Sequence, residues 1–362
     1  MNESNPKSLS APKNNQIYTL AQNETARMTN LHRNQPIMVN GTGTDLKNEN
    51  IILNRAKRKM IAQSMVLKLI DVATEKNELS FIQPLWNTYH CLNTVYTKDG
   101  RLYGKYCKNR FCPVCTAIRK AEIINKYMSI IQTWDNPYLV TLTIKSVPAK
   151  SLNKMMSGMM NAFRTITNKY RKRNQRGHNI KLMGIKSLEC NFNPIKKTYN
   201  PHFHLIVPNK QIAGTLIDEW IKICSKKSTK WVNKSAQQAQ PIWDKNKALM
   251  EVVKYSCKIF TEPDVNNKSK QKGKRDIYIL ALFNIFCAMK GLRLFERFGF
   301  DLPKSSNSNH HKKTIMDNPQ EWEYDAKQND WINTKTGNNL TGYSPNHFLT
   351  ILLSNNVDML LE

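Results

Sequence analysis

The sequence predicts a mixed α+β protein, and three observations along the chain support this prediction. Apolar residues between 138 and 224 form strand-like runs and helix-like spacings in the order β-α-β-β-α. Four cysteines cluster between Cys91 and Cys115, and polar segments without apolar periodicity flank both regions. The β-α-β-β-α order is that of a ferredoxin-like (split βαβ) domain with an antiparallel sheet. We expect a small four-cysteine module and helical extensions beside it.

Periodicity and composition divide the chain into four parts. Residues 1–50 are rich in Asn, Ser, Thr and Gln, which predicts a disordered N-terminal tail. Residues 51–135 are expected to form a helix and the cysteine module, 136–300 the sheet domain, and 301–362 a polar linker with a C-terminal segment. The predicted helices are 54–71, 117–134, 150–170, 212–221, 247–260 and 277–297, the predicted strands are 138–144, 182–192 and 202–207, and 88–116 is predicted as a cysteine-bearing loop.

The charge balance indicates a polyanionic partner. The 362 residues contain 55 Lys+Arg and 27 Asp+Glu, a net charge of +28. The window from position 136 to position 217 holds a single carboxylate, Glu189, among many cations. A segment so rich in cations predicts a surface that binds DNA phosphates. A basic surface that only contacts solvent is the alternative. The predicted DNA contacts are the basic run at the end of the 150–170 helix, namely Lys169, Arg171, Lys172, Arg173 and Arg176.

Neither a membrane span nor a secreted disulfide scaffold is expected. The first forty residues contain no apolar run of the length that a secretory signal needs, and the longest apolar stretch, 277–289, is shorter than the ~20 residues of a transmembrane helix. Eight cysteines in such a chain predict reduced thiols. We therefore expect a soluble, cytoplasmic protein with no membrane partner.

A candidate metal site lies in the sequence Asn200-Pro-His-Phe-His204. Residues i and i+2 of a strand point to one face, so His202 and His204 project together. Glu189 lies in the preceding strand and reaches the same face if the two strands pair. Two imidazoles and a carboxylate can hold Mg2+ or Mn2+ with open positions for a phosphodiester oxygen. An ordinary surface or core His-x-His pair is the alternative.

The next helix supplies a candidate nucleophile. Glu251 precedes Tyr255 by four residues and Lys258 follows it by three, so the three residues share one helical face. Tyrosine attack on a phosphodiester conserves the bond energy in a phosphotyrosine, a nearby lysine offsets phosphate charge, and a carboxylate activates water. An amphipathic helix with a half-buried tyrosine and a surface Glu-Lys pair is the alternative.

The cysteine cluster has the spacing of a structural zinc site. Cys112 and Cys115 form a Cys-x2-Cys turn, with Cys107 and Cys91 upstream. Four thiolates bind Zn2+ in a closed tetrahedron that folds a loop too polar to form its own core. His90 in place of one thiol, and buried or redox-active thiols without metal, are the alternatives.

Taken together, these motifs resemble the plasmid rolling-circle replication initiators of the HUH endonuclease superfamily, in the branch with an N-terminal cysteine cluster. The resemblance covers roughly residues 91–299. It rests on Arg110-Phe-Cys-Pro-Val-Cys115, Thr141-Leu-Thr143, Glu189 with Pro201-His-Phe-His204, Glu251-Val-Val-Lys-Tyr255-Ser-Cys-Lys258 and Ala288-Met-Lys-Gly-Leu-Arg293. One departure is Asn200, where many members carry a third histidine.

The resemblance implies a site-specific, single-strand-nicking endonuclease domain. His202, His204 and Glu189 would bind Mg2+ or Mn2+, and Tyr255 would attack, leaving a 5′-phosphotyrosine and a free 3′-OH primer. Glu251 corresponds to a carboxylate that some members use to activate water for the terminating cleavage. The implied partners are plasmid origin DNA, single-stranded or as a hairpin, a host helicase and a host DNA polymerase.

Motif order narrows the choice within the superfamily. Conjugative relaxases carry their tyrosine upstream of the histidines, whereas Tyr255 lies downstream, and Glu251 occupies the position of the second tyrosine of two-tyrosine members. A single-tyrosine HUH transposase shares the same chemistry, and a non-catalytic zinc-bearing DNA-binding repressor belongs to a different class. Both stay open as alternatives.

Overall fold

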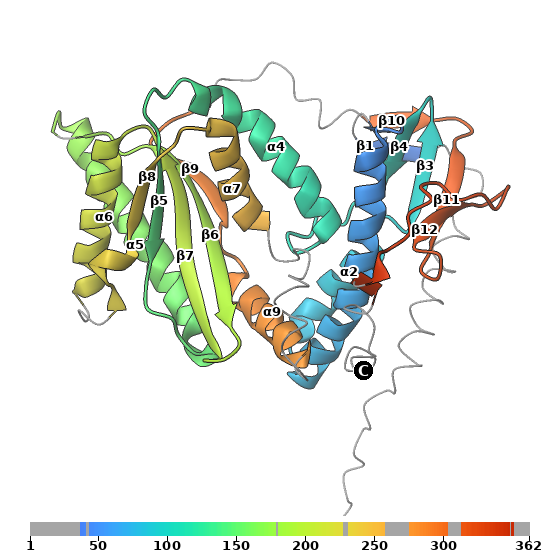
Figure 1. The fold of residues 1–362 in the computed structure, drawn as a ribbon, viewed down its shortest axis with the longest axis horizontal. Coiled ribbons are helices and arrows are strands. Elements are labelled where there is room, and N and C mark those ends of the chain that lie inside the picture. Colours follow the sequence, from blue (N-terminus) through green and yellow to red (C-terminus); the bar gives the residue numbers. More distant parts are fainter. Residues whose placement is uncertain are drawn as a thin grey trace, which may run out of the picture.

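The computed structural model describes residues 37–40, 43–178, 180–226, 231–257, 275–302, 313–347 and 349–350. This part of the chain is a mixed α+β structure whose strands pair antiparallel throughout, which confirms the predicted class. Two five-stranded sheets lie at opposite ends of the molecule, with helices between them (Figure 1). Two short strands, β1 (Ile37–Asn40) and β2 (Thr44–Asp45), form inside the segment expected to be a tail, while residues 1–36 lie outside the described residues.

The first sheet carries the predicted histidine strand at its centre. Its strand order is β8-β5-β7-β6-β9. These strands are β5 (Tyr138–Thr143), β6 (Gly184–Asn193), β7 (Thr198–Val207), β8 (Gln238–Pro241) and β9 (Phe295–Phe298). Helix α5 (Ala149–Gln175) joins β5 to β6, and β7 lies between these two strands. This is the split β-α-β arrangement.

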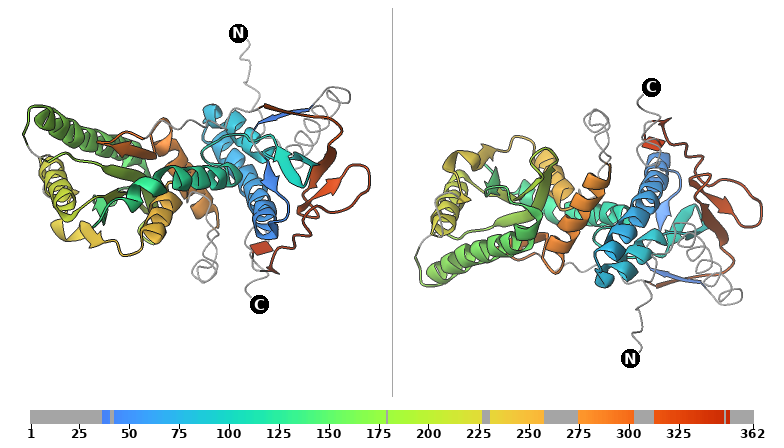
Figure 2. Two further views of the ribbon diagram at one scale, coloured as in Figure 1. Left: turned by 90° about the horizontal axis from the view of Figure 1, so that it is seen from above. Right: turned by 90° about the horizontal axis from the view of Figure 1, so that it is seen from below.

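The two faces of this sheet pack against different helices, because successive side chains of a strand alternate in direction. The helices beside α5 are α4 (Pro113–Gln132), α6 (Lys210–Ser225) and α7 (Lys245–Cys257). On one face Phe203 packs with α5 and with Trp220 of α6. On the other face Ile185 and Ile206 pack against Val252 of α7 and against the C-terminal half of α4. Figure 2 shows the sheet from above and below, with helices on both of its sides.

Most of the predicted elements of this sheet are present, but two strands were missed and one helix was predicted too long. The strands and helices expected between residues 138 and 224 are present. The edge strands β8 and β9 were not expected. The prediction of a helix over 277–297 is wrong at its C-terminal end: α9 (Arg275–Met289) stops before Gly291, which adopts φ +77°, and β9 follows. The helix expected over 247–260 is described only as far as Cys257.

The second sheet changes the interpretation of residues 88–116. That segment, expected to be a loop, contains the hairpin of β3 (Thr94–Lys98) and β4 (Arg101–Gly104). Asp99 and Gly100 form its turn with φ values of 50° and 68°. An Asp-Gly pair with positive φ at both residues is a strong hairpin signal, so the sequence did contain the evidence for these strands.

The C-terminal segment completes the second sheet. Strands β11 (Gln320–Asp325) and β12 (Asp330–Asn333) extend it in the order β12-β11-β3-β4-β2, and β10 (Lys313–Met316) pairs with β1. The fully buried Trp331 donates its indole N–H to the carbonyl of Leu92 at 2.7 Å. The segment 320–333 therefore packs on the cysteine-bearing region, which lies far upstream in the chain.

Further helices of the described part of the chain lie between the two sheets (Figure 1). They are α2 (Glu49–Glu75), α3 (Ile82–Tyr89) and α9. Side chains of α2, α3 and α9 contribute to the same core as α5 and α6, which ties the cysteine region to the first sheet. Among the described helices, none has the length and apolar character needed to cross a membrane.

Gly299, just after β9, gives a stability prediction. Its φ is +75°, and a Cβ added there would lie 1.9 Å from the carbonyl oxygen of Leu182. We expect Gly299→Ala to lower the free energy of unfolding by about 2 kcal/mol or more, measured by urea denaturation. Gly158→Ala is the matched control, because a Cβ there meets nothing within 4 Å and alanine favours the α5 interior. Equal stability of the two variants would contradict the prediction.

Candidate functional site

Glu189, His202 and His204 meet on one face of the first sheet. Glu189 on β6 is the register partner of His202 on β7, and Ser187 is the partner of His204. Both imidazole Nε2 atoms lie 3.2 Å from Glu189 Oε2. Antiparallel pairing brings a residue and its register partner to the same face of a sheet. The three residues therefore converge as the sequence predicted.

Hydrogen bonds orient both imidazoles. His202 Nδ1 lies 3.0 Å from the carbonyl oxygen of Asn200, which only accepts, so Nδ1 donates this hydrogen bond and Nε2 is the ring nitrogen that faces Glu189. His204 Nδ1 lies 3.3 Å from Thr141 Oγ1 on β5. Such contacts to the distal nitrogen are how proteins orient metal-binding histidines. The side chain of His204 is the most exposed of the three, at 14%.

The carboxylate of Glu189 is arranged to receive a cation. Burial by itself raises its pKa, but the two imidazoles outweigh burial, and the pKa of Glu189 is lowered. Its Oε2 atom is buried and has no partner of hydrogen-bonding geometry. Ligand atoms at about 2.1 Å from one octahedral ion lie about 3 Å apart, close to the spacing seen here. The three side chains thus fit a divalent cation.

Asn200, at the start of the histidine motif, has a structural role. Its Nδ2 donates to the carbonyl of Ile144 at 3.1 Å, and its Oδ1 accepts from Thr143 Oγ1 at 3.3 Å. The side chain ties the start of the histidine motif to the end of β5.

Helix α7, which carries the predicted nucleophile, covers the same face of the sheet. Its residues Leu249 and Val252 are buried in one cluster with apolar side chains of β6 and β7. Glu251 is half-buried on this helix. Tyr255 belongs to the last described turn, but its side chain lies outside the described residues, and so does all of Lys258.

The predicted basic run forms the last turns of α5 and the residue after it. Lys169 is engaged in an ion pair, with its Nζ 2.6 Å from Glu219 Oε1. The guanidinium of Arg173 lies 6.0 Å from the centre of the Tyr170 ring. The other three residues of the run are exposed, namely Arg171, Lys172 and Arg176.

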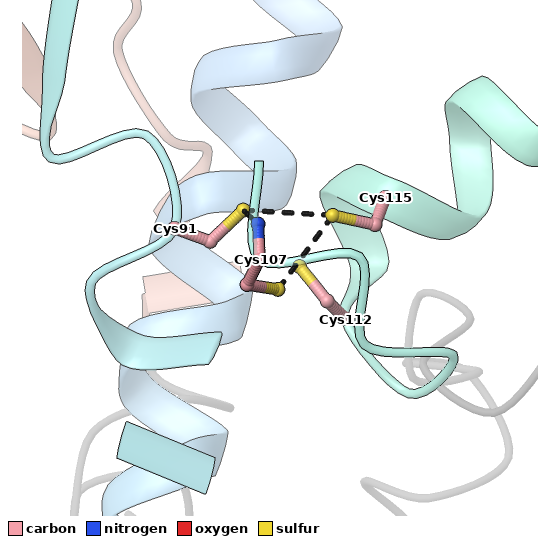
Figure 3. Close-up of side chains that lie close together, drawn as sticks. All are labelled: Cys91, Cys107, Cys112 and Cys115. Atoms are coloured by element: carbon pink, nitrogen blue, oxygen red, sulfur yellow. Dashed lines mark hydrogen bonds between the residues drawn. The ribbon is translucent and has the colours of Figure 1, made fainter. Parts of the chain in front are cut away.

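The four clustered cysteines converge from three different parts of the module (Figure 3). Cys91 follows α3, Cys107 follows β4, and Cys112 and Cys115 begin α4. The sulfur of Cys115 lies 3.6 Å from the sulfurs of Cys91 and Cys107. Four sulfurs bound tetrahedrally at about 2.3 Å from one Zn2+ lie about 3.8 Å apart, whereas a disulfide needs about 2.0 Å. The cluster thus fits a tetrahedral metal ion.

The alternative in which His90 replaces a thiol does not match this geometry. All four sulfurs belong to the group, and His90 does not. Its Nδ1 lies 3.1 Å from Asn93 Nδ2, and its ring stacks on Trp86.

A buried lysine that was not predicted supports a metal in this cluster. Lys59 on α2 is fully buried, and its ammonium donates to the carbonyl of Tyr89 at 2.7 Å and to Asn93 Oδ1. Burial lowers the pKa of Lys59 to about 7, and the nearby cysteine sulfurs act in the opposite direction.

No carboxylate in the described part of the chain pairs with Lys59, and the cysteine sulfurs are the groups that raise its pKa. A zinc ion with four thiolates carries a net charge of −2, which a buried ammonium would offset. The sequence does contain a trace of this buried position. Arg55, Lys59 and Gln63 are spaced four residues apart, so they lie on one side of α2, and all three are buried.

Comparisons with known proteins agree on one family. The family model described as "Replication protein" matches residues 101–327. Curated relatives named "Protein rep" come from Staphylococcus aureus (32% identical over 166 residues, 42% of this chain and 69% of that protein), Streptococcus pneumoniae serotype 2 (29% over 152 residues, 39% and 46%) and Bacillus amyloliquefaciens (31% over 123 residues, 32% and 34%). The chain thus spans less than half the length of the last two relatives. No solved structure matches it significantly.

Proposed function

Because the chain belongs to the replication protein family, we propose that it initiates plasmid rolling-circle replication by nicking one strand of its origin DNA. The observation that carries this proposal is the convergence of Glu189, His202 and His204 on one face of the sheet. The split β-α-β sheet supports the assignment of residues 136–300 as a ferredoxin-like HUH endonuclease domain. The net charge of +28 suits a DNA substrate.

In this proposal the described side chains bind and orient the scissile phosphate. Glu189 and the Nε2 atoms of His202 and His204 would hold Mg2+ or Mn2+, which polarises the phosphate when bound. The carbonyl of Asn200 keeps His202 in the required tautomer, and Thr141 positions His204. The buried carboxylate contributes a fixed negative charge to this site.

The proposed nucleophile is Tyr255. A bond forms between its phenolic oxygen and phosphorus while the bond from phosphorus to the 3′ oxygen breaks, and the phenolic proton is passed on as the 3′ oxygen becomes a hydroxyl. The product is a 5′-phosphotyrosine and a 3′-OH primer for a host polymerase, with a host helicase separating the strands. Lys258 would offset phosphate charge, and Glu251 would activate water in the terminating cleavage.

The cysteine module is proposed to bind structural Zn2+. With all four positions of the ion filled by Cys91, Cys107, Cys112 and Cys115, such a site has no open position for chemistry. It would instead fix the junction between the β3-β4 hairpin and the start of α4. Helix α4 packs by its other end with α7, so this module would also support the proposed catalytic face.

The test is a covalent adduct with labelled single-stranded origin DNA. We expect the protein with Mn2+ to give a band of reduced mobility that survives denaturation, and to give none with EDTA. His202→Ala should reduce the rate of adduct formation about 100-fold, because metal binding loses a direct ligand. His178→Ala removes an exposed histidine outside the site and should react like the wild type. DNA binding with no adduct under any condition would instead favour the repressor.

A further inference from the structure

A cavity lies at the free edge of the first sheet, beside β9. This edge pocket has a volume of about 920 Å³ and is lined by the C-terminal half of α5, by β9, by residues 299–301, and by Tyr127 of α4. We propose that the edge pocket binds an unpaired nucleotide of the DNA strand next to the cleavage site. The choice of DNA rests on the proposed function, whereas a site for phosphate and base rests on the pocket itself.

The edge pocket lies close to the Glu189 site, one strand away across the sheet. Phe295 of β9 is the register partner of Ser187, and Ser187 lies two residues before Glu189 on β6. One strand spacing across the sheet and two residues along it place the backbones of Phe295 and Glu189 roughly 8 Å apart. Register partners share a face, so Phe295 points to the same side as Glu189. A DNA strand bound at Glu189 that crosses this sheet edge therefore reaches the pocket within a few nucleotides.

The charges of the pocket suit phosphate. Its cations are Arg171, Lys181, Arg293 and Arg297. Its two carboxylates are already engaged: Glu296 accepts from the buried Lys186 at 2.8 Å, and Asp301 lies 3.7 Å from the guanidinium of Arg297. Over the described ranges, no carboxylate pairs with the other three cations, all of which are exposed. Because arginine presents a planar fork of donors that matches phosphate oxygens, this excess positive charge favours a phosphate ligand.

The remaining lining suits a base. Phe295 packs edge-on against Tyr127 with ring centres 5.3 Å apart, and Phe300 is half-buried beside them. Aromatic side chains stack with bases of any sequence. The amide side chains of Asn168 and Gln175 offer donors and acceptors to a Watson-Crick edge, which is exposed only when the base is unpaired. The pocket thus combines phosphate and base recognition for a single strand.

The test compares two double variants by fluorescence anisotropy with a labelled oligothymidylate of about twenty nucleotides. Arg171→Ala/Arg293→Ala removes two cations of the pocket, and Lys154→Ala/Lys210→Ala removes two exposed lysines of α5 and α6 outside it. We expect the pocket variant to bind at least about tenfold more weakly, with a salt slope lower by about 1.4, since each lost single-strand phosphate contact lowers it by about 0.7. The lysine variant should bind within about twofold of the wild type.

Two further measurements distinguish a single strand from duplex DNA and from a free nucleotide as the ligand of the pocket. A duplex of the same length should bind the wild type and the pocket variant with similar affinity, and millimolar dTTP should not displace the oligonucleotide. Equal losses in both double variants, or binding of dTTP in preference to the strand, would overturn the proposal. Adduct formation with Mn2+, measured on the same proteins at saturating DNA, separates the two proposals. If the protein forms the adduct but the pocket variant keeps the salt slope of the wild type, the pocket proposal is refuted. If the pocket variant has a lower salt slope but the wild type forms no adduct, the nicking function is refuted.

Discussion

Tyr255→Phe is expected to abolish the covalent adduct completely. The substitution removes only the phenolic oxygen, so the helix retains no hydroxyl at this position to form the bond to phosphorus. Denaturing gels with labelled single-stranded origin DNA and Mn2+ should show no shifted band even after prolonged incubation. The affinity for DNA, measured by anisotropy, should stay within about twofold of the wild type, because the cation site is untouched and α7 keeps its buried contacts through Leu249 and Val252.

Tyr138→Phe is the matched control. Tyr138 begins β5 and packs against the core beneath α5 and α6, on the sheet face opposite Thr141 and His204. This variant should form the adduct at the wild-type rate. An adduct in Tyr255→Phe would show that another residue attacks, and cleavage without an adduct would show that activated water is the nucleophile.

Cys115→Ser is expected to unfold the cysteine module. Serine is a much poorer zinc ligand than a thiolate, and the remaining three sulfurs then no longer close the tetrahedron. We expect loss of bound zinc, measured by elemental analysis, and a decrease of about 3 kcal/mol or more in the free energy of unfolding. Lys59 would at the same time lose the negative charge that its buried ammonium needs, which adds to the destabilisation.

Cys224→Ser controls for the loss of a thiol as such. Cys224 lies near the end of α6, outside the four-sulfur group, and burial raises its pKa to about 11. The control should retain one zinc per chain and unfold near the wild-type denaturant concentration. Chelation of the wild type should reproduce the effect of Cys115→Ser. Wild-type stability and zinc content in that serine variant would refute a structural zinc site.

The elements of the first sheet were predictable because their signals are local. The apolar run from Tyr138 and the helical spacing over 150–170 can each be recognised within a single window of sequence. The His-x-His pair shares a face by strand geometry alone. Glu189 joins that pair only because β6 and β7 are neighbours in sequence and in the sheet, which short connections favour.

The elements that were missed depend on distant parts of the chain. β9 is a short strand that exists by pairing with β6, far upstream, and its apolar residues were therefore assigned to the preceding helix. β11 and β12 could not be recognised from their own sequence, because Trp322 and Trp331 find their hydrogen-bond partners at and beside the β3-β4 hairpin. The β3-β4 hairpin is a different case, since its Asp-Gly turn was a readable local signal.

Composition and short-range spacing were enough to specify the chemistry that this protein can carry: the His-x-His pair with a lone carboxylate, the tyrosine helix, the four spaced thiols and the excess of cations. The relative positions of these groups came from folding. Strand register set the 3.2 Å approach of Glu189 to both imidazoles, and long-range packing created the edge pocket and buried Lys59 beside the sulfurs. Residue type is a local property, whereas register, burial and convergence arise when segments far apart in the chain exclude water together.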